Sequence, residues 1–143
     1  MNGPRRGLLL IGAAAVLVSG YIHFYLYFWG GYRGISIDRV VGLDISRSFA
    51  LNAIAALVIA ELLVIGSRVD RLARPAAVLG VLFAVSAIGA YVLSRTSGLL
   101  GFIENSWSVE AVIAETAQVI AVVALSSYLI ASMRTPAVEA AAY

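Results

Sequence analysis

The stretch that decides the fold is residues 7–29, GLLLIGAAAVLVSGYIHFYLYFW. It contains no Asp, Glu, Lys or Arg, and a helix needs about 20 mainly apolar residues to cross the hydrocarbon core of a membrane. Two arginines precede it in the manner of a secretory signal, but its apolar region exceeds the roughly 7 to 15 residues of such a signal. The stretch therefore predicts a retained membrane-spanning helix.

Three further apolar stretches of similar length follow, and they span residues 46–66, 75–94 and 109–133. None of them alternates apolar and polar residues with the period of two that a membrane β-barrel needs. The 143 residues are 62% hydrophobic and 13% charged, whereas soluble domains are roughly half apolar and a quarter charged. We expect one integral membrane domain over residues 1–143, with an all-α fold: an antiparallel four-helix transmembrane bundle.

The ends of these stretches carry residues that favour helix boundaries. Asp44 or Ser46 is expected to cap the second helix, Pro75 to occupy the first turn of the third, and Ser106 or Ser108 to cap the fourth. Small residues are expected on the packed faces, namely Gly12, Val16 and Ser19 in the first helix, Ala56 and Ala60 in the second, and Ser86 and Ala90 in the third.

The arginines predict the orientation, because cytoplasmic loops of membrane proteins carry an excess of positive residues. With the N-terminus inside, six arginines lie on the inner side and four on the outer side. We therefore expect a multi-pass protein of the plasma (inner) membrane with both termini cytoplasmic. The inner arginines are Arg5, Arg6, Arg68, Arg71, Arg74 and Arg134, and the outer ones are Arg33, Arg39, Arg47 and Arg95.

Several function classes are disfavoured by composition. The chain has no cysteine, which excludes disulfides, thiol catalysis and cysteine-held metal centres. Its net charge is only +2 and the arginines are scattered, so no nucleic-acid partner is expected. A bis-histidine haem needs a second histidine, and the sequence identifies no cofactor. The serines lack a nucleophile context, which favours a non-catalytic protein without excluding an enzyme.

Polar residues inside a span are costly and usually face the bundle interior or a cavity. At 1.5 Å of rise per residue, His23, Asn52 and Glu115 each lie about 9 Å from the proposed outer end of their helix. Gln118 lies three residues after Glu115 on the same face. Two interpretations remain open: an internal polar clamp that holds the helices together, or a ligand-binding site.

The second interpretation has several forms. His23 with Glu115 and Glu104 would offer ligands to a divalent cation, although no metal-binding spacing is present and the metal stays unknown. Aromatic residues that end the first span, among them Tyr27 and Tyr32, are typical interface anchors and also suit a flat lipidic ligand such as a quinone or isoprenoid.

Four further charged residues have expected roles. Arg33 and Arg95 are expected near the outer surface, where they would attract an anionic headgroup. Glu61 lies about 180° from Asn52 around its helix, and we expect it to pair with Arg68 at the inner end or, alternatively, to contact another protomer or subunit.

The block from His23 through Gly31-Tyr32-Arg33, followed by Leu51-Asn52 and by Gly101 to Glu104, resembles small four-span integral membrane proteins of actinobacterial type. The chain is also loosely similar to four-helix membrane proteins of the DoxX type. These resemblances imply the fold and the membrane location, a histidine near the outer end of the first span and a Gly-Tyr-Arg loop. They imply no activity.

Two functions are compatible with this sequence. The first is a non-catalytic accessory or interaction subunit, whose outer loops dock a partner or membrane lipid, as a homo-oligomer or within a larger membrane complex. The second is a ligand-binding or proton-coupled transport protein for a lipidic or anionic small molecule, with a site formed by His23 and Glu115.

Overall fold

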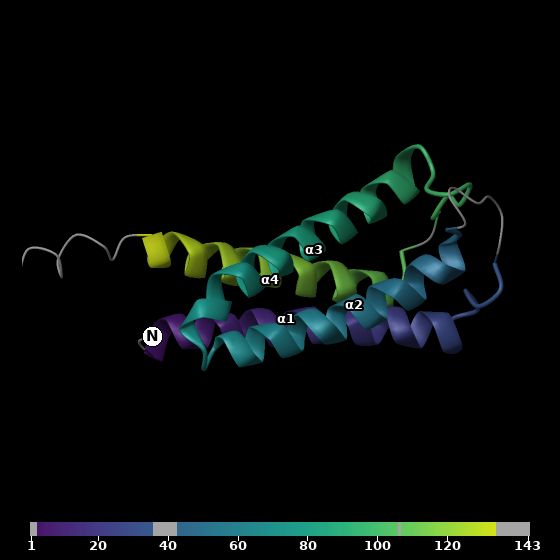
Figure 1. Ribbon diagram of the computed structural model, residues 1–143. Helices are drawn as coiled ribbons and strands as arrows, with labels where there is room; N and C mark the ends of the chain where they lie inside the picture. Colours follow the sequence, from purple (N-terminus) through teal and green to yellow (C-terminus); the bar gives the residue numbers. More distant parts are fainter. Residues whose placement is uncertain (1–2, 36–42, 106, 134–143) are drawn as a thin grey trace, which may run out of the picture.

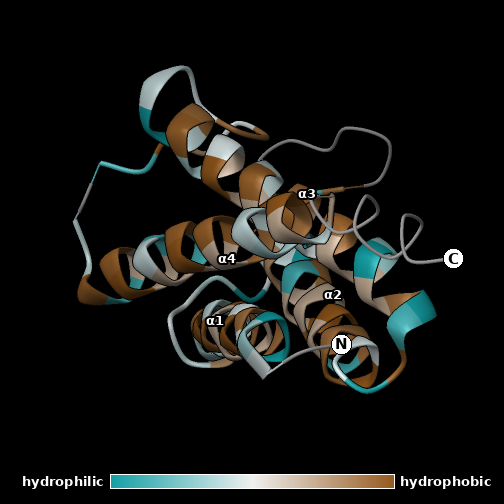
Figure 2. Ribbon diagram, turned by 90° about the vertical axis from the view of Figure 1, so that its left-hand side faces the viewer, coloured by the Kyte–Doolittle hydropathy of each residue, from teal (hydrophilic) through white to brown (hydrophobic). Residues whose placement is uncertain are grey.

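The computed structural model describes residues 3–35, 43–105 and 107–133, and its architecture there is four α-helices without a β-strand (Figure 1). All four helices are long and apolar enough to cross a membrane, and Figure 2 shows hydrophobic residues along most of their length. The prediction of an all-helical chain with four helices of membrane-spanning length is confirmed. The helices are α1 (Gly3–Phe28), α2 (Ile45–Gly66), α3 (Asp70–Thr96) and α4 (Val109–Met133).

Each helix packs against two main neighbours: α1 and α3 both contact α2 and α4, and α1 contacts α3 less extensively. Residues 67–69 join α2 to α3 at the end where α1 begins and α4 ends, which we name the turn end (Figure 1). The two longer connections lie at the opposite end, which we name the loop end. Towards the loop end, α3 diverges from the other helices.

Small residues let the helices approach closely along the predicted inward faces. Gly12, Val16 and Ser19 of α1 are buried, as are Ala56 and Ala60 of α2. At Gly20 a methyl group would lie 2.4 Å from the Ala56 Cβ, so only glycine fits the contact between α1 and α2. Close backbone approach of this kind is typical of packing between membrane helices.

Two arginines bind the end of α4 at the turn end. The Arg5 Nη2 atom donates to the Ala131 carbonyl at 2.7 Å, and the Arg74 Nη2 atom donates to the Ser132 carbonyl. The last carbonyls of a helix have no partner within the helix, and a basic side chain there both satisfies them and complements the helix dipole. Residues from α1 and α3 thereby hold the same end of α4.

Two expectations about α3 are wrong. α3 begins at Asp70, so Pro75 lies inside it rather than in its first turn. Ser86 is exposed, and its hydroxyl donates to the Leu82 carbonyl of its own helix, so the packed face of α3 is formed by Ala77, Gly80 and Ala84 instead.

The expected pair between Glu61 and Arg68 is also wrong, since neither side chain forms an ion pair within the described part of the chain. α2 ends at Gly66, and the chain turns at residues 67–69 before Arg68 completes the seven-residue helical spacing on which the expectation depended. Glu61 is exposed on the surface of α2.

The expected caps of α2 and α4 are present. Asp44 accepts a hydrogen bond from the Arg47 amide at 2.8 Å, and Ser108 accepts one from the Ala111 amide at 3.1 Å. The alternative cap Ser106, together with Arg39 and Arg134, lies outside the described residues.

Candidate functional site

A cavity of about 130 Å³ lies between the helices near the loop end. All four helices and both longer connections contribute to its wall. For scale, an apolar protein cavity of about 150 Å³ accommodates benzene. The cavity is somewhat smaller than that and is comparable in size to one six-membered ring.

Three polar side chains of the wall come from three different helices. His23 of α1, Asn52 of α2 and Glu115 of α4 line the cavity together. The calculated depths account for this convergence, because each depth is counted from the helix end at the loop end, where α1 ends and α2 and α4 begin. No hydrogen bond joins any two of these three side chains within the described residues.

The single histidine is held by its own helix. Its Nδ1 atom lies 2.8 Å from the Ser19 carbonyl, and its ring packs against Phe49 with centroids 5.2 Å apart. A carbonyl only accepts hydrogen bonds, so Nδ1 is the donor and carries the proton. In the neutral ring the Nε2 atom is then an acceptor, and it has no hydrogen-bond partner among the described residues.

Asn52 and Glu115 also have no hydrogen-bond partner among the described residues. The Asn52 amide oxygen is buried without a hydrogen bond. The Glu115 side chain is partly buried and has no hydrogen bond or ion pair within the described part of the chain. An unpaired polar group away from water costs about 1–3 kcal/mol, and an unpaired charge costs more. The cavity thus holds hydrogen-bonding capacity that the protein leaves unused.

The contact that fixes α1 to α4 lies one turn deeper. The Gln118 Nε2 atom donates to the Ser19 hydroxyl at 2.8 Å, and both side chains are buried. The Gln118 amide oxygen has no partner. Gln118 does not line the cavity, and the interhelical clamp expected of His23, Asn52 and Glu115 is formed by Gln118 and Ser19 instead.

Aromatic rings form the outer wall of the cavity. Tyr32 stacks on Phe49 with centroids 4.4 Å apart and planes 19° apart, and it meets Phe102 edge to face at 5.7 Å. Tyr91 of α3 contributes a fourth ring to the lining. These contacts bring both longer connections against α2 and α3 over the polar groups.

The Tyr32 hydroxyl donates a 3.0 Å hydrogen bond to Glu104 Oε2, which joins the two connections. We name this contact the Tyr32–Glu104 latch. Burial raises the pKa of Tyr32 to about 12, with further contributions from the hydrogen bond and charge of Glu104 and from Glu110. Glu104 is anchored in turn, because its amide donates to the Ser94 carbonyl of α3 at 2.9 Å.

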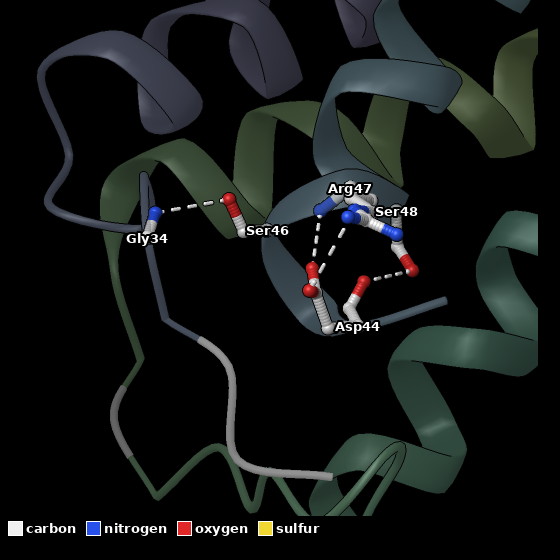
Figure 3. A network of polar contacts seen from close by, with 5 residues as sticks. All are labelled: Gly34, Asp44, Ser46, Arg47 and Ser48. Atoms are coloured by element: carbon white, nitrogen blue, oxygen red, sulfur yellow. Dashed lines mark hydrogen bonds and ion pairs between the residues drawn. The ribbon is translucent and has the colours of Figure 1, made fainter. Parts of the chain in front are cut away.

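Local turns explain how the connections reach these positions. Gly31 and Gly34 have φ of 83° and 84°, a conformation that favours glycine, and the Gly34 amide donates to the Ser46 hydroxyl at the start of α2 (Figure 3).

In the other connection, Leu100 and Gly101 have φ of 52° and 74°, and Leu99 and Phe102 exchange backbone hydrogen bonds. That turn directs the chain back so that Phe102 reaches the cavity.

The remaining predicted residues lie outside the cavity lining. The Arg33 guanidinium lies 5.8 Å from the Phe28 ring centroid, and the Arg95 guanidinium lies 4.1 Å from that of Trp107. Tyr27 is partly buried and packs edge to face on Phe28. No lysine or arginine lines the cavity within the described residues.

The expected metal ligands do not form a cluster. His23, Glu115 and Glu104 all line the cavity, but no group of three metal-ligating side chains is close enough to hold an ion among the described residues. The residues that sequence reasoning missed are Phe49, Tyr91 and Phe102. No motif marks them, because aromatic residues at helix ends are common in membrane proteins.

Comparisons with protein-family models, with curated proteins and with solved structures gave no match to this chain.

Proposed function

We propose that this protein is a small plasma-membrane protein that binds the polar head of a lipophilic molecule in the cavity at its loop end. The observation that carries the proposal is the set of unpartnered polar groups on His23, Asn52 and Glu115 around a ring-sized cavity. A purely structural polar layer is expected to satisfy its own hydrogen bonds, because unpaired groups in a span are costly. The side chains of His23, Asn52 and Glu115 instead leave hydrogen-bonding groups available to a ligand.

The proposal includes an antiparallel bundle that crosses the membrane with both termini in the cytoplasm. The described arginines at the turn end are Arg5, Arg6, Arg68, Arg71 and Arg74, and those at the loop end are Arg33, Arg47 and Arg95. This distribution favours a cytoplasmic turn end. The cavity then lies near the outer membrane surface, beside exposed aromatic residues such as Trp29 and Trp107 that suit the interface.

The docking function receives less support from the same geometry. In that function His23, Asn52 and Glu115 would only hold the helices together. The hydrogen bond between Gln118 and Ser19 already joins α1 to α4. An anionic ligand is not proposed either, because Arg33 and Arg95 do not line the cavity.

A cavity-filling variant tests the proposal. Ala90 lines the cavity, so Ala90→Leu is expected to occupy part of it. Gly89 is exposed, with no atom within 4 Å of an added Cβ, so Gly89→Leu adds the same side chain to the outer face of α3. The three proteins are purified in mild detergent, and their bound small molecules are extracted and quantified by mass spectrometry.

We expect one lipophilic molecule per chain in the wild type and in Gly89→Leu, and its loss in Ala90→Leu. The absence of any stoichiometric small molecule in the wild type contradicts the proposal. Equal retention by all three proteins contradicts it as well. A co-purifying protein without a small molecule favours the docking function.

A further inference from the structure

The chemistry of the cavity wall limits the head group that it accepts. Two carboxyl side chains, Glu104 and Glu115, line the cavity, and no lysine or arginine does so within the described part of the chain. Glu104 accepts the hydrogen bond of the Tyr32–Glu104 latch, whereas Glu115 has no protein partner that the structure describes. The wall is therefore unsuited to an anion and favours a group that donates hydrogen bonds.

The polar groups left unused are mainly acceptors. They include the Nε2 atom of His23, whose Nδ1 proton is committed to the Ser19 carbonyl, the Asn52 amide oxygen and the Glu115 carboxyl group, with the Asn52 amide nitrogen as a donor beside them. These three residues belong to three different helices around one cavity. A primary ammonium group has three N–H donors and no acceptor, whereas a hydroxyl has one donor. Only the ammonium group offers a donor to each of the three.

The aromatic wall supports the same chemistry. Tyr32, Phe49, Tyr91 and Phe102 line the cavity together with Glu115. Aromatic faces attract cations through their quadrupole, and this attraction strengthens when the cation is removed from water. A positively charged ligand would complement a carboxyl group that lies beside aromatic rings and has no protein cation in the described lining.

We infer that the cavity binds a lipophilic primary amine in its ammonium form, through Glu115, His23 and Asn52, with the organic body against the aromatic wall. This inference rests on the proposed function. The cavity of about 130 Å³ is comparable in size to one ring, which makes benzylammonium, a single ring that carries a primary ammonium group, a suitable probe.

The test compares three probes of nearly equal shape: benzylammonium, benzyl alcohol and benzoate. Their dissociation constants for the full-length protein in mild detergent at neutral pH are measured by isothermal titration calorimetry. We expect benzylammonium to bind about 10-fold more tightly than benzyl alcohol, the factor that corresponds to 1.4 kcal/mol. No binding of benzoate is expected.

Two variants attribute the preference to one carboxyl group. Glu115→Gln keeps the shape of the side chain and removes its charge, so benzylammonium is expected to lose its advantage over benzyl alcohol. Glu61→Gln makes the same change on an exposed residue outside the cavity and is expected to keep the wild-type preference. The comparison of probes on the wild type holds even where a variant fails to fold.

Equal or tighter binding of benzyl alcohol to the wild type overturns the inference, and so does unchanged preference in a folded Glu115→Gln variant. In both cases the proposed function stands, provided that Ala90→Leu weakens probe binding. Failure of all three probes overturns the inference, and the native ligand found by mass spectrometry then decides the proposed function separately.

Discussion

The side chain of Gln118 donates a 2.8 Å hydrogen bond to the hydroxyl of Ser19, and 99 residues separate the two along the chain. Both side chains are at most 1% exposed. The Ser19 carbonyl also accepts the hydrogen bond of His23. One residue of α1 therefore fixes both the contact with α4 and the orientation of the histidine in the cavity.

Removing one partner of this bond is expected to destabilise the bundle more than removing both. Ser19→Ala leaves the whole Gln118 amide unpaired, and we expect it to lower the free energy of unfolding by about 1–3 kcal/mol. The double variant Ser19→Ala with Gln118→Leu removes the buried polar groups and is expected to recover most of that loss. Denaturant unfolding in mild detergent measures both values. A double variant less stable than Ser19→Ala contradicts this account.

The contact between Gly20 and Ala56 gives a second test. In Gly20→Ala the new methyl group would lie 2.4 Å from the Ala56 Cβ, so α1 and α2 must separate. Overpacking of this kind costs about 1–3 kcal/mol. Gly89→Ala meets no atom within 4 Å and is expected to be neutral or to stabilise by up to about 1 kcal/mol, since alanine favours a helix. Comparable melting temperatures for the two variants would show that the close contact is absent.

The burial of Tyr32, together with the Tyr32–Glu104 latch, predicts a loss of stability at high pH. The folded-state pKa of Tyr32 is raised from 10.0 to about 12, so the neutral phenol is favoured in the folded protein. Its contribution is fully present below pH 10 and is lost as the pH rises through about 12. We expect the melting temperature of the wild type to fall in this interval more than that of Tyr32→Phe. Parallel pH profiles for the two proteins contradict the latch.

At the turn end, Arg74→Met is expected to lower the free energy of unfolding. The Ser132 carbonyl loses its donor, and the end of α4 loses a positive charge. The expected loss is about 0.5–1.5 kcal/mol. Arg71→Met is the control, because Arg71 is exposed and the structure gives it no hydrogen bond or ion pair. The same denaturant titration measures both variants, and equal stability would contradict a stabilising role of Arg74 at the end of α4.

The sequence predicts most of the helices and the level of the polar residues, because both follow from local quantities. Apolar length gave the four spans, and the rise per residue placed His23, Asn52 and Glu115 at one depth. The rest depends on contacts between distant segments. Phe102 reaches the cavity only through a turn in which Leu100 adopts a positive φ, and no pattern in the sequence signals this turn.

The same distinction explains the errors. The sequence predicts a helix start at Pro75, but the helix begins five residues earlier at Asp70 and contains the proline within its early turns. Likewise, the expected pair between Glu61 and Arg68 assumed a continuous helix, and the turn after Gly66 interrupts it.

The central claim is that His23 presents an acceptor nitrogen to a ligand in the cavity. The chain has one histidine, so ¹⁵N NMR of histidine-labelled protein reports on this site alone. The account predicts a neutral ring protonated on Nδ1, with an Nε2 signal that shifts when benzylammonium is added and stays constant in Ala90→Leu. A ring protonated on Nε2, or an Nε2 signal that does not shift when benzylammonium is added to the wild type, would contradict the claim.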